Sequence, residues 1–399
     1  MRPHILNVGA AVTTWCSISL ARVVPIDNTE DQNTLKTEWG AQCRDLTIPV
    51  HVAKTSERDF ALGDYDIGVL FALIGREVLI DADYEISARF CEPSPDQETH
   101  EDTLQLLVHG SMYNKAMWDF PYKRDTYSWT RFMNLNGFAT LAVDLVGAGK
   151  STHPDGLLEA QIEVFVQTLH DIIQQLRTTT LLGKTFSQIA YVGFSVGAIV
   201  GNGIADRYPN DVDMLLFLGI TWMKDYIYPV FMAGGQTAAA KVNPRKWGKL
   251  EEYYQTQPSI LGREMSLYSG DYETGALEMD HAMRDTDTLG AAVAFPFHLV
   301  TATNYTGPVF LGIGENDGIF CGGSCGDMPY GVLGRFPQAS LHKVKIYPRA
   351  GHALVFHQCA RELQKDVLGF LNRQSSGSRA RSQPELDHSQ QQRLRARHM

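Results

Sequence analysis

The sequence predicts an α/β fold built on a mostly parallel, doubly wound sheet. Short apolar runs recur along the chain, as expected of parallel strands covered on both faces. These runs are Thr103–Val108, Phe138–Val143, Ile189–Val192, Met214–Ile220, Pro308–Gly314 and Lys343–Tyr347. Helical patterns lie between or after them, as in residues 158–176, where apolar side chains recur at intervals of three and four. Alternating strands and helices pack as a sheet between helical layers.

Length and composition are those of one enzyme-sized domain with an insertion. The chain has 399 residues, of which 44% are hydrophobic and 20% charged, so it can bury a large core. The formal net charge is −10, although residues 374–399 carry a net positive charge. The remaining body is therefore strongly acidic, which argues against a nucleic-acid partner.

The first 21 residues are typical of a secretory signal peptide. Arg2 precedes an apolar run, Ile5–Leu20, and Ser19–Ala21 provides a small-x-small cleavage site. The run is short and contains Thr and Ser, and no later segment has transmembrane length, so we expect no stable membrane span. We expect a secreted or secretory-pathway protein, with a retained anchor or a buried helix as alternatives. The sequon at Asn304 fits an N-glycosylated, secreted protein.

Cysteine usage fits an oxidising compartment. Cys16 would leave with the signal peptide, and Cys43, Cys91, Cys321, Cys325 and Cys359 would remain. Cys43 could pair with Cys91, and Cys321 with Cys325 across a short loop, but spacing alone does not establish the connectivity. No second Cys or His pair at zinc-finger spacing lies near Cys321 and Cys325, so we expect no metal site.

Composition divides the chain into six parts. Within the second part, Thr47–Ala53 has the pattern of a short strand. Asp83–Cys91 alternates polar and apolar residues and is followed by two prolines, which predicts an edge strand. The parts are a signal peptide (1–21), an N-terminal segment (22–75), the first half of the core (76–221), a cap insertion (222–303), the second half of the core (304–373) and a disordered tail (374–399).

The cap insertion is rich in aromatic residues and Met and lacks strand alternation, so we expect it to be mainly helical. Insertions between sheet strands commonly lie over the strand ends, where ligands bind. Most of its aromatic side chains should be ordinary packing residues.

A serine lies in a tight turn between a predicted strand and a predicted helix. The stretch Gly193–Gly197 has the pattern G-x-S-x-G, with Ser195 at its centre. Glycines on both sides remove the Cβ atoms that would collide with neighbouring backbone, so the serine can stand exposed above the sheet. Taken alone, the pattern is equally typical of a glycine-rich turn that contains a serine.

The chain also offers an imidazole and a carboxylate, which a serine hydroxyl needs to become a nucleophile. Asp317 follows the predicted strand 308–313, and His352 follows the strand 343–347. With Ser195, these groups then emerge at the carboxyl ends of parallel strands, where loops converge on one crevice.

Other residues compete for these two positions. Glu315 lies just before Asp317, and Asp225 follows another predicted strand, so either could be the acid. His357 competes with His352 but falls within a helical pattern, whereas His352 lies in a glycine-containing loop. We favour Asp317 and His352.

Together, these motifs resemble those of the α/β-hydrolase fold superfamily over residues 83–372. Besides the serine turn, Leu106–Met112 is similar to the family's His-Gly loop, and Asp144–Ser151 to its Asp-x-x-Gly-x-Gly-x-Ser segment. The resemblance implies an α/β-hydrolase fold with an inserted helical cap. It also implies Ser195 as nucleophile, with His352 as base and Asp317 as acid.

An oxyanion hole needs two backbone N–H groups directed at the developing negative charge. Val196, at the start of the predicted helix, offers one. The resemblance implies Ser111 for the second, with Met112 as a substitute, whereas His109 is expected to be structural. No cofactor is expected, because the Gly149-Lys150-Ser151 stretch lacks the earlier glycine of a phosphate loop.

These features predict a serine hydrolase that cleaves an ester, lactone or thioester of an apolar small molecule. Met112, Trp222 and Tyr226 are the candidate substrate-binding residues, because an aromatic and Met-rich cap suits an apolar group. The chain is similar to secreted fungal hydrolases, some of which accompany natural-product pathways. The alternatives are an epoxide hydrolase, which in this fold uses aspartate as nucleophile, an isomerase or cyclase acting on a polyketide-like metabolite, and a non-catalytic binding protein.

Overall fold

The computed structural model describes residues 35–60, 74–95 and 99–375, which belong to one compact unit, Asn33–Met399. The predicted signal peptide and the predicted disordered tail from residue 376 onward lie outside the described residues. Among the described residues, no helix combines the length and apolar character needed to cross a membrane.

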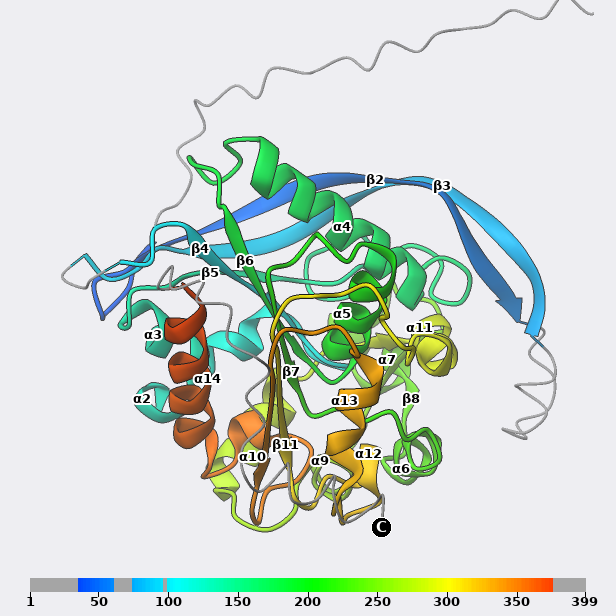
Figure 1. The fold of residues 1–399 in the computed structure, drawn as a ribbon. Coiled ribbons are helices and arrows are strands. Elements are labelled where there is room, and N and C mark those ends of the chain that lie inside the picture. The colour runs from blue at the N-terminus through cyan, green and yellow to red at the C-terminus, as the bar shows by residue number, and fades with distance from the viewer. Residues whose placement is uncertain (1–34, 61–73, 96–98, 376–399) are drawn as a thin grey trace, which may run out of the picture. The chain divides into compact units, whose positions relative to one another are not determined.

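A nine-stranded sheet forms the centre of this unit (Figure 1). Its order is β1-β2-β3-β5-β4-β6-β7-β11-β12. The strands from β5 to β12 pair in parallel, and β1, β2 and β3 add an antiparallel extension. The bounds are β1 Leu35–Lys36, β2 Gln42–Phe60, β3 Ile74–Cys91, β4 Thr103–Val108, β5 Ala139–Val143, β6 Gln188–Phe194, β7 Met214–Leu218, β11 Val309–Gly314 and β12 His342–Tyr347.

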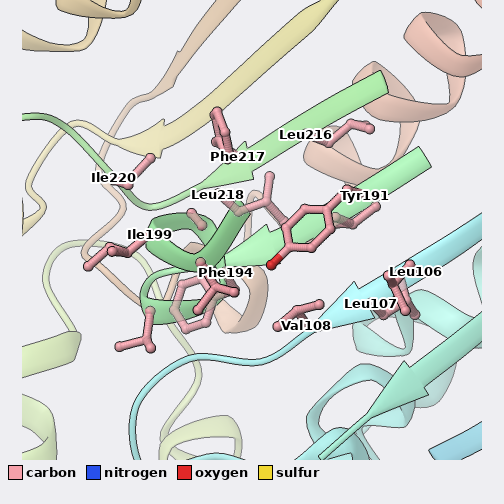
Figure 2. Packing of buried hydrophobic residues seen from close by; sticks show 14 of the residues in the cluster. Leu106, Leu107, Val108, Tyr191, Phe194, Ile199, Leu216, Phe217, Leu218 and Ile220 are labelled. Carbon is pink, nitrogen blue, oxygen red and sulfur yellow. The ribbon is translucent and has the colours of Figure 1, made fainter. Parts of the chain in front are cut away.

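The central strands form because their residues are apolar on both faces. Every residue of β4, β5, β7 and β11 is buried, as expected of parallel strands between helical layers. Figure 2 shows this packing around β6, where Tyr191 and Phe194 lie among side chains of β4, β7 and α5. The predicted mostly parallel α/β sheet is confirmed.

Helices cover both faces of the sheet. In Figure 1, α4 and α5 lie on one face and α14 packs with α2 and α3 on the other. The bounds in the core are α2 Arg124–Tyr127, α3 Trp129–Asn134, α4 Ile162–Thr178, α5 Val196–Arg207, α12 Gly318–Cys321, α13 Val332–Arg335 and α14 Ala360–Ser375, with 3-10 turns at Lys115–Asp119, Met328–Gly331 and Leu354–Phe356.

Residues 222–303 hold short helices and a small antiparallel sheet of order β10-β9-β8. This sheet is absent from the sequence prediction, because strands of two or three residues show no alternation. The bounds are α6 Ile227–Ala233, β8 Thr237–Ala238, α7 Ala239–Val242, α8 Pro244–Trp247, β9 Tyr254–Thr256, α9 Ile260–Leu267, α10 Thr274–Met283, β10 Asp287–Thr288, α11 Leu289–Ala294 and a 3-10 turn at Phe295–Phe297.

The predicted edge position of residues 83–91 is wrong. They belong to β3, which lies between β2 and β5. The pairing with β5 begins only at Ala88, so the preceding residues pair with β2 alone and alternate between buried and exposed. The alternation therefore marks a strand with one open face and not a sheet edge.

Both disulfides considered from the sequence are present. Cys43 and Cys91 join β2 to β3 at directly paired positions, and Cys321 and Cys325 close the loop after α12. Cys359 is the free cysteine among the described residues.

Candidate active site

Ser195 occupies a strained turn between β6 and α5. Its backbone has φ 53° and ψ −114°, values that a non-glycine residue rarely adopts. A Cβ on Gly193 would lie 2.4 Å from the carbonyl oxygen of Gly197, and one on Gly197 would lie 2.3 Å from that of Val108. Only glycine fits at either position, so the G-x-S-x-G pattern has a steric basis.

A buried hydrogen bond secures the first turn of α5. Tyr191 of β6 is fully buried, and its hydroxyl donates to the carbonyl oxygen of Gly197 at 2.6 Å. Ser195 N also donates to the Leu218 carbonyl of β7 at 2.9 Å. The strained turn is therefore held by hydrogen bonds from Tyr191 of β6 and to Leu218 of β7. A strained backbone conformation persists only where its surroundings hold it in this way.

The structure brings Ser195, His352 and Asp317 into one hydrogen-bonded chain. His352 Nε2 lies 2.9 Å from Ser195 Oγ, and His352 Nδ1 lies 2.8 Å from Asp317 Oδ2. The three residues are 5%, 2% and 0% exposed. This geometry allows the imidazole to accept the serine proton while the carboxylate orients the ring.

The acid position is occupied by Asp317 and by neither competitor. Asp317 caps α12, and its Oδ1 accepts a hydrogen bond from Phe320 N at 2.9 Å. Glu315 is exposed and accepts from Arg349 N, and Asp225 is also exposed. Neither is placed to orient His352.

The other two histidines near the site have structural partners. His109 Nε2 accepts from Leu145 N at 3.0 Å, so its Nδ1 donates to the Gly110 carbonyl. His357 Nε2 accepts from Gly351 N at 3.0 Å, and its Nδ1 donates to the Ala353 carbonyl. Burial lowers the pKa of both imidazoles. Both rings are thus neutral parts of the loops that carry the site.

Near Ser195, the backbone N–H groups of Val196, Ser111 and Met112 have no acceptor among the described residues, so both predicted positions of the second donor, Ser111 and Met112, are open. The loop carrying Ser111 approaches closely, since a Cβ on Gly110 would lie 3.0 Å from Ser195 Cβ. Met112, the next residue of the loop, has a positive φ of 59°. The Ser111 hydroxyl donates to Asp287 of β10, a contact that the sequence did not suggest.

A small cavity lies over Ser195 and His352. Of the three candidate substrate-binding residues, Met112 lines this cavity, and Trp222 and Tyr226 do not. The Trp222 indole is 8% exposed, donates to Asn202 at 3.0 Å and packs on Phe336, and Tyr226 is 36% exposed beside Gly322. The cavity's further lining residues are Ser111, Tyr113, Phe194, Phe231, Gln236, Gln257, Ser266, Leu267 and Ile319.

The prediction for Trp222 and Tyr226 rested on their place at the start of the cap, which says nothing of the direction in which a side chain points. Gln236, Gln257 and Ser266 lack any motif, so no local signal could have identified them. Among residues 35–60, 74–95 and 99–375, no group of three or more His, Cys, Asp or Glu is placed to hold a metal ion.

The Asp144–Ser151 segment has a structural role. Asp144 is buried and accepts hydrogen bonds from Lys115 N at 2.7 Å and Lys150 N at 3.0 Å. Gly149 has φ +60°, and a Cβ there would collide with the Asp144 carboxylate. The carboxylate thus holds this loop beside the loop that carries Ser111.

Known proteins resemble this chain in sequence and in structure. Residues 126–358 match the model of a family described as serine aminopeptidase, S33. A stretch of 115 residues is 30% identical to epoxide hydrolase 3 of Xenopus tropicalis; it covers 29% of this chain and 27% of that relative. The match therefore spans about a quarter of the relative's length.

Solved structures with a similar arrangement include a thermophilic esterase from Thermogutta terrifontis, at 19% identity and a TM-score of 0.49, covering 73% of this chain and 95% of that one. A monoacylglycerol lipase from Paleococcus ferrophilus is 18% identical with a TM-score of 0.47, covering 68% of this chain and 94% of that one.

Proposed function

The chain belongs to the α/β-hydrolase family described as serine aminopeptidase, S33, and on this basis we propose that it cleaves an ester-type bond through an acyl-Ser195 intermediate. The observation that carries the proposal is the buried Ser195–His352–Asp317 chain of hydrogen bonds, with two contacts of 2.9 and 2.8 Å. Ser195 and His352 of this chain of hydrogen bonds both line the cavity described above.

In the proposed mechanism, Ser195 Oγ attacks the carbonyl carbon while His352 Nε2 takes its proton. The carbonyl oxygen becomes an oxyanion that Val196 N–H and Ser111 N–H stabilise, each contributing about 3 kcal/mol of barrier lowering. When the intermediate collapses, the C–O bond to the alcohol breaks and His352 protonates the departing oxygen. A water molecule, deprotonated by His352, then attacks the acyl carbon and releases the acid and free Ser195.

The cavity walls favour an apolar substrate. Five of the lining side chains are apolar: Met112, Phe194, Phe231, Leu267 and Ile319. Its lining contains no Asp or Glu among the described residues, so nothing in it matches the amino group that an aminopeptidase must bind. We therefore favour an ester, lactone or thioester of an apolar small molecule that carries no charged amine. A role in natural-product metabolism belongs to this proposal as well.

We also propose that the protein is secreted. The two disulfides among the described residues support an oxidising compartment, where such bonds persist. Expression with the native first 21 residues, followed by mass analysis of the protein in the medium, would test this. A mature chain that begins after Ala21 is expected, and retention of the full chain inside the cell would contradict secretion.

Labelling with a fluorophosphonate probe tests the acyl-enzyme directly. The wild type should label, and the S195A variant should stay silent while its circular dichroism remains unchanged. A folded wild type that does not label would refute the proposal and favour a binding protein or an isomerase. Hydrolysis of p-nitrophenyl esters of graded chain length would then define the acyl group, and an epoxide substrate turned over by S195A would instead indicate a different nucleophile.

A further inference from the structure

One segment of the cap reaches the loop that carries Ser111. Residues 285–290, which include β10, bond to that loop and to two other core loops. Asp285 N donates to the Met112 carbonyl at 2.9 Å, and Asn114 Nδ2 donates to the Asp285 carboxylate at 2.7 Å. Further bonds run from Thr286 Oγ1 to the Gly147 carbonyl and from Thr288 Oγ1 to the Ala160 carbonyl.

The most direct of these contacts is the hydrogen bond from Ser111 Oγ to Asp287 Oδ2. The other carboxylate oxygen of Asp287 accepts from Thr288 N at 2.8 Å, so the carboxylate is fixed within its own strand. Both residues are buried, and the cavity beside them is lined by apolar groups such as Val146 and Phe165 together with the polar side chains of His109, Thr286 and Thr288. Water is thus a poor competitor for the Ser111 hydroxyl.

The backbone of this loop needs external support. Met112 holds a positive φ of 59°, which a side chain with a Cβ adopts at some energetic cost. Its carbonyl is held by Asp285 N from the cap, and the preceding residue is held by Asp287. The Gly110 carbonyl, which belongs to the peptide that bears the Ser111 N–H, is held from the core by His109 Nδ1 at 2.8 Å and Tyr113 N at 3.3 Å. The cap adds the contacts to the Ser111 hydroxyl and the Met112 carbonyl, so core and cap together determine the conformation of this loop.

We propose that Asp287 is a positioning residue that acts through the Ser111 hydroxyl to aim the Ser111 N–H at the developing oxyanion. The position of the cap on the core then affects the rate of the chemical step as well as the access of substrate to Ser195. This inference rests on the proposed function, because it assigns Ser111 to the oxyanion hole. Loss of one oxyanion donor lowers kcat about 10²- to 10³-fold, so loss of its support should lower kcat by about 10- to 100-fold.

A double-mutant cycle tests the proposal with the full chain and a p-nitrophenyl ester. D287A and S111A should each lower kcat with KM changed less than about twofold, and the double variant should be no slower than the slower single variant. D287N keeps one acceptor oxygen, which can accept from the Ser111 hydroxyl while the bond from Thr288 N is lost, so its kcat should lie between those of D287A and the wild type. Additive effects of D287A and S111A, an effect confined to KM, or a D287N variant as slow as D287A would each overturn the proposal.

Asp211 supplies the matched control. It is also buried, and it accepts hydrogen bonds from His170 and Gln174 of α4, next to the amino end of β7 and so at the edge of the sheet opposite the site. D211N should lower the melting temperature but leave kcat unchanged. If D287A does not fold, S111A and D287N complete the test. The proposed function is tested separately. Labelling of the wild type by the fluorophosphonate probe, with no labelling of S195A, supports it whatever the results for the Asp287 and Ser111 variants.

A different observation concerns Gln236, one of the residues that line the cavity over Ser195 and His352. Its Nε2 is buried and has no hydrogen-bond acceptor among the described residues. Gln257 in the same wall contrasts with it, since its Nε2 donates to Ser266 Oγ at 2.6 Å and its Oε1 accepts from Arg263 at 3.1 Å. A buried donor without a partner lowers stability by about 1–3 kcal/mol.

We infer that the substrate satisfies this amide. It then carries a second acceptor oxygen, a ketone, ether or further ester, away from the carbonyl that Ser195 attacks. This inference names the substrate class of the proposed function and rests on it. A bound alkyl ester would exclude water from Gln236 Nε2 and offer it no acceptor. The protein should therefore prefer an ester that carries a second acceptor oxygen over an alkyl ester.

Matched esters that differ by one oxygen test this inference. In p-nitrophenyl pentanoate the methylenes at C3 and C4 are replaced in turn by an ether oxygen, and in the alkyl alcohol half of butanoate esters the methylenes from the third carbon onward are replaced in the same way. The wild type should prefer at least one oxygen position about fivefold or more in kcat/KM over the alkyl parent. Q236L should abolish that preference, whereas F231L should change both kinds of ester alike.

A wild type with no preference at any position, or a Q236L variant that retains it, would overturn the inference. Failure to hydrolyse any of these esters would count against the proposed function itself.

Discussion

Replacing Asp287 by Asn should change how stability depends on pH. Burial raises the pKa of Asp287 from 3.8 to about 6, and the hydrogen bonds from Ser111 and Thr288 N oppose that shift only in part. The difference of about 2 units corresponds to about 3 kcal/mol between the two protonation states, at 1.36 kcal/mol per unit. The folded protein therefore binds the Asp287 proton more tightly than the unfolded chain does.

The sign follows from that difference. Below pH 4 the carboxyl is protonated in both states, and its contribution to stability is fully present. As the pH rises from about 4 to 6, the unfolded chain releases the proton and the folded protein retains it, so the wild type loses up to about 3 kcal/mol. The amide introduced by D287N does not titrate, so this variant should gain stability relative to the wild type across this window and hold a constant difference above it.

Urea unfolding of the two proteins at pH 4 to 8 measures this difference, because the titration of all other groups cancels between them. A difference in unfolding free energy that is independent of pH would refute the reasoning. S111A provides a control. It removes a hydrogen bond that lowers the pKa of Asp287, so this pKa should rise further in the folded variant. The pH-dependent loss of stability in S111A should therefore continue to higher pH than in the wild type.

Three further outcomes are expected. D317N should lower kcat about 10⁴-fold, because it disturbs the orientation and tautomer of the histidine, whereas E315Q should stay within twofold, as steady-state kinetics would show. Y191F should lower the free energy of unfolding by about 1 kcal/mol in urea titration, since it removes the buried bond to the carbonyl after the nucleophile turn. G197A should not yield a folded protein, because its Cβ would lie 2.3 Å from a backbone oxygen of β4; a soluble variant with native circular dichroism would contradict this.

Much of the fold could be predicted because the information is local. The parallel strands appear as apolar runs, since both faces of each strand are covered. The strained turn at Ser195 appears as flanking glycines, since only they fit there. Asp317 and His352 could be paired with it because residues just beyond parallel strands gather at one edge of the sheet.

The errors have equally physical causes. Alternation in residues 83–91 indicated an edge strand, but it arises because one face of this part of β3 is buried and the other exposed, while β3 itself pairs with both β2 and β5. Trp222 and Tyr226 belong to the predicted cap, yet one packs into the core and the other lies on the surface. Neither a strand's neighbours nor a side chain's direction is encoded in the residues beside it in the chain.

The sequence by itself determined the α/β class, the glycine-flanked turn at Ser195 and the positions of Asp317 and His352 just beyond two strands, because these depend on local backbone sterics and on strand ends. Only the tertiary structure decided which acid meets His352, which cap side chains face the cavity, and that Asp287 holds Ser111. Those contacts join residues as far as 176 positions apart. They depend on how the cap packs on the core, and no short stretch of the chain records that packing.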